Sequence, residues 1–246
     1  MESIVPQKYT TSFIRKEQLS KDAYIFYFDR RAVEFSFIPG QYIRLFLPIT
    51  PTDGRGNGRF FSIITSPENS NEFAICTRII QSEFKKALAT LTPQSQVSFT
   101  GPYGRFVLEE TNVSPRVFLA GGIGITPFHS MLLYAAEKNL AIPLTLFVSF
   151  STAEEVIFYN ELKVLEKKNS HINIVYTISH PDALPANWQG ETGRISKEMI
   201  TKYIKDVTKP IYFLAGPPPM VDAMGEIVGS FGLSSEQIKK ENFTGY

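Results

Sequence analysis

The chain has 246 residues, enough for one large domain or two small ones, and 43% of them are hydrophobic, which is ordinary for a globular protein. Its formal net charge of +1 argues against a nucleic-acid surface, which normally shows clustered basic charge. No apolar run reaches the roughly 18 residues of a membrane-spanning helix, and the first residues show no secretory leader, so neither membrane insertion nor export is expected.

Cysteine and histidine are scarce in this chain. Cys76 is the only cysteine, so the chain forms no internal disulfide and holds no cysteine-ligated iron–sulfur cluster by itself. A chain with one thiol suits a reducing compartment, and we expect a cytoplasmic location. The three histidines, His129, His171 and His180, show no ligand spacing near acidic residues, and no metal site is expected.

The first hundred residues are expected to form short strands separated by Gly and Pro turns. The expected strands are Tyr24–Phe28, Gln41–Leu47, Arg59–Ile64, Phe73–Ile79 and Gln96–Phe99. One helix interrupts them at Glu83–Leu91, with Ser82 as its N-cap. Short strands at this spacing favour an antiparallel barrel or sandwich.

From about Pro115 onward, strands and helices alternate, which predicts a parallel sheet covered by helices on both faces. The expected strands are Val117–Ala120, Leu144–Ser149, Asn173–Ile178 and Ile211–Ala215. The expected helices are Pro127–Lys138, Ala153–Lys168, Ser196–Asp206 and Pro218–Phe231. The polar segment Glu109–Ser114 marks the change of pattern, so we expect domains at residues 1–110 and 111–246.

A glycine-rich turn joins an apolar strand to a helix in the run Phe118–Pro127. Glycines let a backbone approach a pyrophosphate closely, and the helix N-terminus offers unpaired N–H groups. The run is not the G-x-G-x-x-G fingerprint, because Pro127 stands where the last glycine would be. On these residues alone, a tight turn without a ligand remains the alternative.

A second motif is Gly58–Ile63, in which Arg59 and Phe61 share one face of a strand while Phe60 and Ser62 share the other. Such a group can clamp a phosphate, stack on a ring and hydrogen-bond a heteroatom, although a barrel strand with one solvated Arg is the simpler interpretation.

Two further turns complete the set. Gly101–Phe106 is a turn before the expected boundary, with a simple connection as its first interpretation. The turn at Ala215–Met220 follows a buried strand, so it should lie beside Gly121–Pro127 at the carboxyl edge of the sheet, where ligands bind in open parallel sheets.

Taken together and in order, these motifs give the chain a resemblance to the ferredoxin–NADP reductase family of flavoproteins. Arg59-Phe60-Phe61-Ser62 resembles the family's flavin motif Arg-x-Tyr-Ser, and Pro39-Gly40-Gln41-Tyr42 and the closing run Glu241–Tyr246 are similar to other landmarks. The resemblance implies an antiparallel β-barrel that binds the flavin, followed by an α/β parallel-sheet domain that binds the nicotinamide.

The resemblance also implies roles for individual residues. Arg59 would pair with the flavin pyrophosphate, Phe61 would pack on the flavin, and Ser62 would hydrogen-bond near flavin N5, which accepts the hydride. Ser62, Glu241 and Tyr246 are the expected catalytic residues. The cofactor-binding set that it implies is Arg59, Phe60, Phe61, Ser62, Ile75, Cys76, Thr77, Ser82, Gly121, Gly122, Ile123, Gly124, Thr126, Pro127, Ser149, Ser151, Ala215, Gly216, Pro217, Met220 and Tyr246.

Three positions depart from the family's pattern. Phe61 replaces the usual Tyr, and Ala215 replaces a Cys that commonly precedes Gly-Pro-Pro, which excludes a thiol at that point. Hydride transfer itself needs mainly proximity and orientation. His129 stands where Arg is frequent, and we expect it at the surface or behind the residues that contact ligand.

The remaining questions concern the donor, the flavin and the C-terminus. Glu154 and Glu155, without an Arg near Ser151, favour NADH over NADPH, although two acids also suit a helix N-terminus. The serine-led helix and Arg59 favour FAD over FMN. Tyr246 would either cover the flavin or pack on the barrel, and Glu241 would either contact the nicotinamide or be solvated.

The expected function is electron transfer from NAD(P)H through FAD to a ferredoxin, flavodoxin or oxygenase component. The alternatives are reduction of a small acceptor, such as free flavin, ferric chelate or quinone, and a flavin-bearing subunit without turnover.

Overall fold

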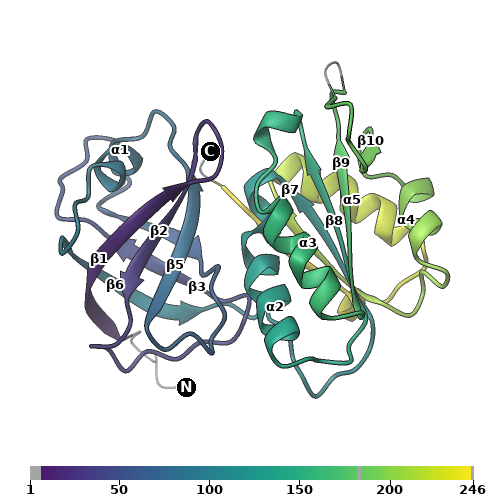
Figure 1. The fold of residues 1–246 in the computed structure, drawn as a ribbon, viewed down its shortest axis with the longest axis horizontal. Coiled ribbons are helices and arrows are strands. Elements are labelled where there is room, and N and C mark those ends of the chain that lie inside the picture. Colours follow the sequence, from purple (N-terminus) through teal and green to yellow (C-terminus); the bar gives the residue numbers. More distant parts are fainter. Residues whose placement is uncertain (1–6, 182–183, 245–246) are drawn as a thin grey trace.

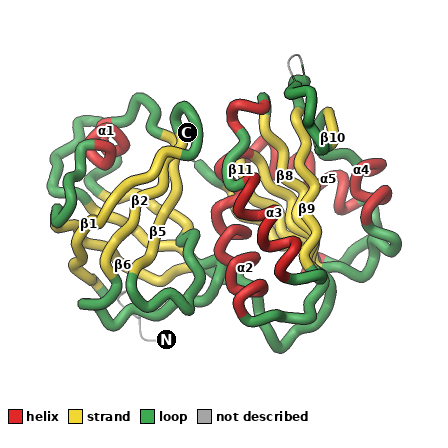
Figure 2. The backbone as a smooth tube through the Cα atoms, viewed as in Figure 1, coloured by secondary structure: helices red, strands yellow, loops and turns green. Residues whose placement is uncertain are grey.

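A computed structural model describes residues 7–181 and 184–244, and it divides the strands between two sheets. Figure 1 shows a strand-rich half that carries the N-terminus beside a half in which helices flank a sheet. Figure 2 shows the same contrast by element type. The expected fold class, an antiparallel barrel followed by a parallel α/β sheet, is confirmed.

The first sheet has the strand order β4-β3-β6-β1-β2-β5, and its strand pairs are antiparallel. A bridge between Ile63 and Ile75 brings the end of β4 to β5, so the sheet curls into a barrel. Its elements are β1 (Lys8–Gln18), β2 (Ala23–Asp29), β3 (Tyr42–Phe46), β4 (Gly58–Ser62), β5 (Glu72–Arg78), α1 (Glu83–Ala89) and β6 (Gln96–Tyr103).

The second sheet has the order β10-β9-β8-β7-β11-β12, and all its pairs are parallel. Its strands are β7 (Arg116–Gly121), β8 (Leu144–Phe150), β9 (Ile172–Ile178), β10 (Glu191–Thr192), β11 (Ile211–Gly216) and β12 (Ile238–Asn242). Its helices are α2 (Thr126–Glu137), α3 (Tyr159–Lys168), α4 (Lys197–Tyr203) and α5 (Pro218–Gly229), with short 3₁₀ turns η1 (Gly122–Ile125), η2 (Ala153–Glu155) and η3 (Ser235–Gln237).

The helices cover both faces of the parallel sheet, as the alternating pattern predicted. Phe128 of α2 and Leu162 of α3 belong to one hydrophobic cluster, whereas Ile200 of α4 and Val221 of α5 belong to another. The α2–α3 cluster continues into the barrel through Ile25 and other residues of its strands, so the two halves share an apolar contact. Helix α2 lies on the side of the parallel sheet that faces the barrel (Figure 1).

Several predicted boundaries are wrong. The predicted helix over 153–168 is broken: η2 ends at Glu155, and α3 begins only at Tyr159, because Phe158 adopts a left-handed backbone (φ 61°) and is buried. Three paired strands, β1, β10 and β12, were not predicted: polar residues hide the period of two in β1 and β12, and β10 has only two residues. Strand β6 runs on to Tyr103, so the turn predicted at 101–106 begins three residues later than expected.

Within the two described ranges, no helix is long and apolar enough to cross a bilayer.

Candidate active site

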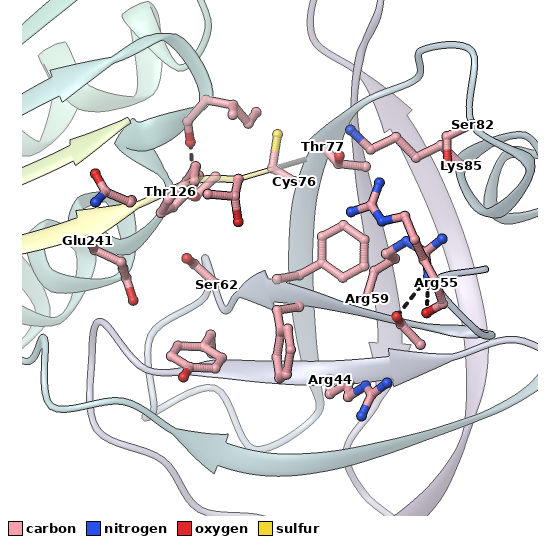
Figure 3. Close-up of a pocket in the computed structure, with 18 residues that line it drawn as sticks. Arg44, Arg55, Arg59, Ser62, Cys76, Thr77, Ser82, Lys85, Thr126 and Glu241 are labelled. Carbon is pink, nitrogen blue, oxygen red and sulfur yellow. Dashed lines mark hydrogen bonds between the residues drawn. The ribbon is translucent and has the colours of Figure 1, made fainter. Parts of the chain in front are cut away.

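A pocket of about 510 Å³ lies where the barrel meets the carboxyl edge of the parallel sheet, and both halves of the chain line it (Figure 3). The barrel contributes residues of β3, β4, β5 and α1, and the second half contributes η1, the start of α2, and β12 with the residues after it. The predicted site residues that it brings together are Arg59, Phe60, Phe61, Ser62, Cys76, Thr77, Ser82, Ile123, Thr126 and Glu241.

Positive side chains gather at one end of the pocket, where Arg44, Arg55, Arg59 and Lys85 line the wall (Figure 3). The Arg59 guanidinium is held by the loop before β4: it donates to Asp53 Oδ2 at 2.6 Å and to the Gly56 carbonyl at 2.7 Å. Burial, helped by the charge of Arg55, lowers the pKa of Lys85 to about 8. Four cations around one end of a pocket suit a phosphate or pyrophosphate group.

Arg44 is placed unusually for a cation. Its guanidinium carbon lies 5.1 Å from the centre of the Phe46 ring and 5.5 Å from that of Phe60. Its Nε is buried and has no hydrogen-bond partner among the residues that the structure describes. Gly58 makes room for it, because a Cβ there would stand 2.7 Å from that nitrogen. A buried donor without a partner is costly, so this atom points to a ligand oxygen.

The other end of the pocket carries hydroxyls and a carboxyl group. Ser62 is buried at the end of β4, and the Thr126 hydroxyl donates to the Ile123 carbonyl at 2.9 Å. Glu241 reaches the pocket from β12, and its Oε2 is buried without a hydrogen-bond partner in the described part of the chain. Burial raises the pKa of Glu241 to about 7. The alternative of a solvated Glu241 is therefore wrong.

The glycine turn and the Gly-Pro-Pro turn pack directly on each other, as predicted. A Cβ on Gly124 would lie 2.3 Å from the Ala215 carbonyl oxygen, and one on Gly121 would lie 2.0 Å from Met220 Sδ. Gly122 differs, because its φ of +53° favours glycine and the space beside it is open. Packing therefore explains two of the three glycines, and the backbone at Gly122 is the one that faces free space.

Gly124→Ala is expected to lower the free energy of unfolding by about 2–4 kcal/mol, because the Ala215 backbone cannot move away easily. Urea unfolding measures this loss. Gly229→Ala is the matched control, since nothing lies within 4 Å of its added Cβ, and it should change stability by less than about 1 kcal/mol. Equal stability of both variants would contradict the packing argument.

Other predicted residues do not line the pocket. Ile75 is fully buried in the barrel core, so its expected place along a flavin edge is wrong. Several others gather at the carboxyl edge of the sheet beside the pocket, where β7, β8 and β11 are adjacent in register. These are Gly121, Gly122, Gly124, Pro127, Ser149, Ser151, Ala215, Gly216, Pro217 and Met220. Tyr246 lies outside the described residues.

Sequence reasoning missed eight residues of the pocket wall: Tyr42, Arg44, Arg55, Gly58, Lys85, Asn242, Phe243 and Thr244. Tyr42 and residues 242–244 lie within motifs on which the family resemblance was based, so these motifs could have predicted them as pocket residues. Arg44 gave no signal beyond a charge within a strand. Of the two positions expected for His129, the structure excludes the surface one, since this residue is only 3% exposed.

Comparison with known proteins gives two matches to family models. Residues 10–108 match the oxidoreductase FAD-binding domain, and residues 118–226 match the oxidoreductase NAD-binding domain. Both matched regions of the chain contribute residues to the wall of the pocket.

Curated relatives are similar over most of this chain. The reductase component of propane 2-monooxygenase from Mycolicibacterium goodii is 27% identical over 86% of this chain and 60% of its own length. Ferredoxin–NADP reductase B from Sorangium cellulosum is 26% identical over 85% of this chain and 86% of its own length. The chain spans about 60% of the length of the monooxygenase reductase components that it matches.

The fold also matches solved structures. The flavohem-like FAD/NAD-binding domain of nitric oxide dioxygenase from Vibrio cholerae O1 biovar El Tor superposes with a TM-score of 0.81 at 20% identity, covering 95% of this chain and 98% of that chain. At this identity, the match describes the fold alone.

Proposed function

Because the chain belongs to the ferredoxin–NADP reductase-like family of flavoproteins, we propose that it takes a hydride from NADH onto FAD and passes the electrons singly to an external protein carrier. One observation carries this proposal. A single pocket, lined from both halves, has four cations at one end and Ser62, Thr126 and Glu241 at the other. Such a pocket suits an elongated ligand with a charged phosphate end and a reacting end.

The residues of the pocket fit FAD. Arg59, Lys85 and the unpartnered Arg44 Nε would bind its phosphates, together with Arg55 and Ser82. Phe60, Phe61, Cys76 and Thr77 would contact its rings or its ribityl chain. When bound, FAD supplies a ring that accepts a hydride and releases electrons one at a time. The size of the cationic cluster supports FAD over FMN.

At the reacting end, Ser62 would orient the flavin through its hydroxyl, and Glu241 would face the nicotinamide. The open backbone at Gly122, with Ile123 and Thr126, would hold the pyrophosphate of the donor at the start of α2. Close approach of the two rings, with water kept out by the buried walls, is what hydride transfer requires. Tyr246 remains part of this proposal as a cover for the flavin.

The domain boundary near residue 110 belongs to the same proposal. It is supported by the change of sheet between β6, which ends at Tyr103, and β7, which begins at Arg116. A cytoplasmic location is also proposed, in keeping with a nicotinamide donor and a single buried thiol, Cys76.

The preference for NADH rests on the segment after β8. Glu155 forms an ion pair with Arg78 of β5 at 3.3 Å, so Glu154 is the acid left for a ribose hydroxyl. NADH is expected to show a Michaelis constant at least several-fold below that of NADPH, measured by steady-state reduction of ferricyanide with FAD-loaded protein. A several-fold lower constant for NADPH would contradict the donor assignment and leave the reductase intact.

A protein acceptor is favoured because the similar proteins include reductase components of oxygenases. Docking through charged surfaces makes the rate fall with salt, whereas reduction of free flavin or quinone should change little. Turnover of the intact protein with a bacterial ferredoxin at low and high salt separates the two. The alternative of a flavin-bearing subunit without turnover predicts no reduction of any acceptor.

A further inference from the structure

The first turns of α2 are bonded directly to the backbone that follows β4. His129 Nδ1 lies 2.9 Å from the Ile64 carbonyl, and Ser130 Oγ donates to the Thr65 carbonyl at 2.7 Å. Both side chains are buried, with exposures of 3% and 0%. These carbonyls come two and three residues after Ser62, so one short bonded path joins Ser62 to the helix that follows the glycine turn.

The other nitrogen of the same imidazole has a partner as well. His129 Nε2 lies 3.0 Å from Glu161 Oε2 on α3, and the ring centre lies 4.1 Å from that of Phe158. A backbone carbonyl and a carboxylate can only accept hydrogen bonds. Both contacts exist together only if both ring nitrogens carry protons, which means that the imidazole is a cation.

The surroundings support an ionised partner. Although its partial burial acts in the opposite direction, the hydrogen bond and charge of His129 hold the pKa of Glu161 below its usual value. Glu161 also acts electrostatically on two neighbouring phenols, Tyr27 of β2 and Tyr176 of β9. Burial raises the pKa of both phenols, so they stay neutral in the physiological range and add no charge beside Glu161.

We propose that His129 is a positioning residue which, as the doubly protonated imidazole, fixes the Ser62 strand against α2 and so sets the approach of nicotinamide to flavin. This inference rests on the proposed function, in which nicotinamide approaches a flavin in this pocket. A neutral imidazole can keep only one of its two contacts. Rising pH therefore removes one bond from the junction between the two halves of the pocket.

Glu161→Gln gives the sharpest test, because an amide can donate to Nε2 as well as accept from it. A neutral His129 then keeps both contacts, with Nδ1–H donating to Ile64 and the glutamine amide donating to Nε2. The variant should thus lose the pH dependence without losing the junction. His129→Ala removes both histidine contacts at every pH and leaves the bond from Ser130 to Thr65, and His171→Ala removes an exposed histidine as the matched control.

The first readout is nitrogen-15 NMR of the imidazoles in the FAD-loaded protein, which has only three histidines to assign. Because both of its partners are acceptors, His129 should carry a proton on each ring nitrogen at about pH 6. A singly protonated His129 at about pH 6 would overturn the proposal. This measurement needs no electron transfer, so it stands even if the proposed function fails.

The second readout is stopped-flow reduction of the flavin by NADH from about pH 6 to about pH 9. The wild type should slow by about fivefold relative to Glu161→Gln at the alkaline end, and His129→Ala should be about tenfold slower throughout. His171→Ala should follow the wild type. Parallel pH profiles of the wild type and Glu161→Gln would overturn the proposal. Because Glu241 is present in both proteins, its own titration cancels in this comparison.

Discussion

Arg59→Gln is expected to raise the dissociation constant for FAD by about 10- to 100-fold, so the purified variant should lose most of its flavin on dilution. The reason is the loss of charge-assisted hydrogen bonds, each worth about 1.5–3 kcal/mol, from the cationic end of the pocket. Fluorescence titration of the flavin-free protein with FAD measures the constant, and Arg31→Gln, an exposed cation paired with Asp29, is the control for charge alone.

Arg59 also holds the loop before β4, and a second variant separates this structural role from flavin binding. Asp53→Asn removes the carboxylate that pairs with Arg59 at 2.6 Å but keeps the guanidinium. If Arg59 binds the phosphates, Asp53→Asn should bind FAD as tightly as the wild type or more tightly, because a competing anion is gone. A loss of FAD as large in Asp53→Asn as in Arg59→Gln would assign the effect to the loop.

Glu241→Gln is expected to change how stability depends on pH. Since burial raises the pKa of Glu241 to about 7, the folded protein holds this proton more tightly than the unfolded chain, where a Glu titrates near about 4.3. This contribution to stability is therefore fully present below the unfolded pKa and is lost as pH rises to the folded pKa, by up to about 3–4 kcal/mol. A glutamine at this position does not titrate, so the variant does not lose this stability as pH rises.

The variant should match the wild type at about pH 4 and should be more stable by about 3 kcal/mol at about pH 8. Urea unfolding of the flavin-free protein at both pH values measures this difference, and Glu236→Gln, which removes an exposed carboxylate, is the control. If Glu241 faces the nicotinamide, the variant should also lose a transition near pH 7 in the rate of flavin reduction. A variant that is no more stable than the wild type at the higher pH would contradict a buried, unpartnered carboxyl group.

The central part of the parallel half was predictable because β7, β8, β9 and β11 are largely apolar and helices follow them at regular intervals. That periodicity also predicted that Gly121–Pro127 and Ala215–Met220 meet, since adjacent parallel strands end at one edge. Strand β12 escaped prediction because Ile238-Lys239-Lys240-Glu241-Asn242 is polar, and only its pairing with β11 makes it a strand. The position of Glu241 in the pocket depends on that pairing.

The other features that were not predicted depend on contacts between residues far apart in the chain. The break before α3 depends on burying Phe158, against which the His129 ring packs. The bonds from His129 to Ile64 and Glu161 span 65 and 32 residues, and no local pattern encodes them. Arg44 reaches the pocket only because Gly58, on the neighbouring strand, leaves it room.

The proposed function depends most on a working hydride path from nicotinamide to a flavin held in the pocket. The direct test is the visible absorbance spectrum of the purified, FAD-reconstituted protein under anaerobic conditions, before and after addition of NADH. Flavin bands that bleach with NADH are the predicted result. A protein that takes up no flavin, or whose flavin bands persist with both NADH and NADPH, would contradict the proposed function.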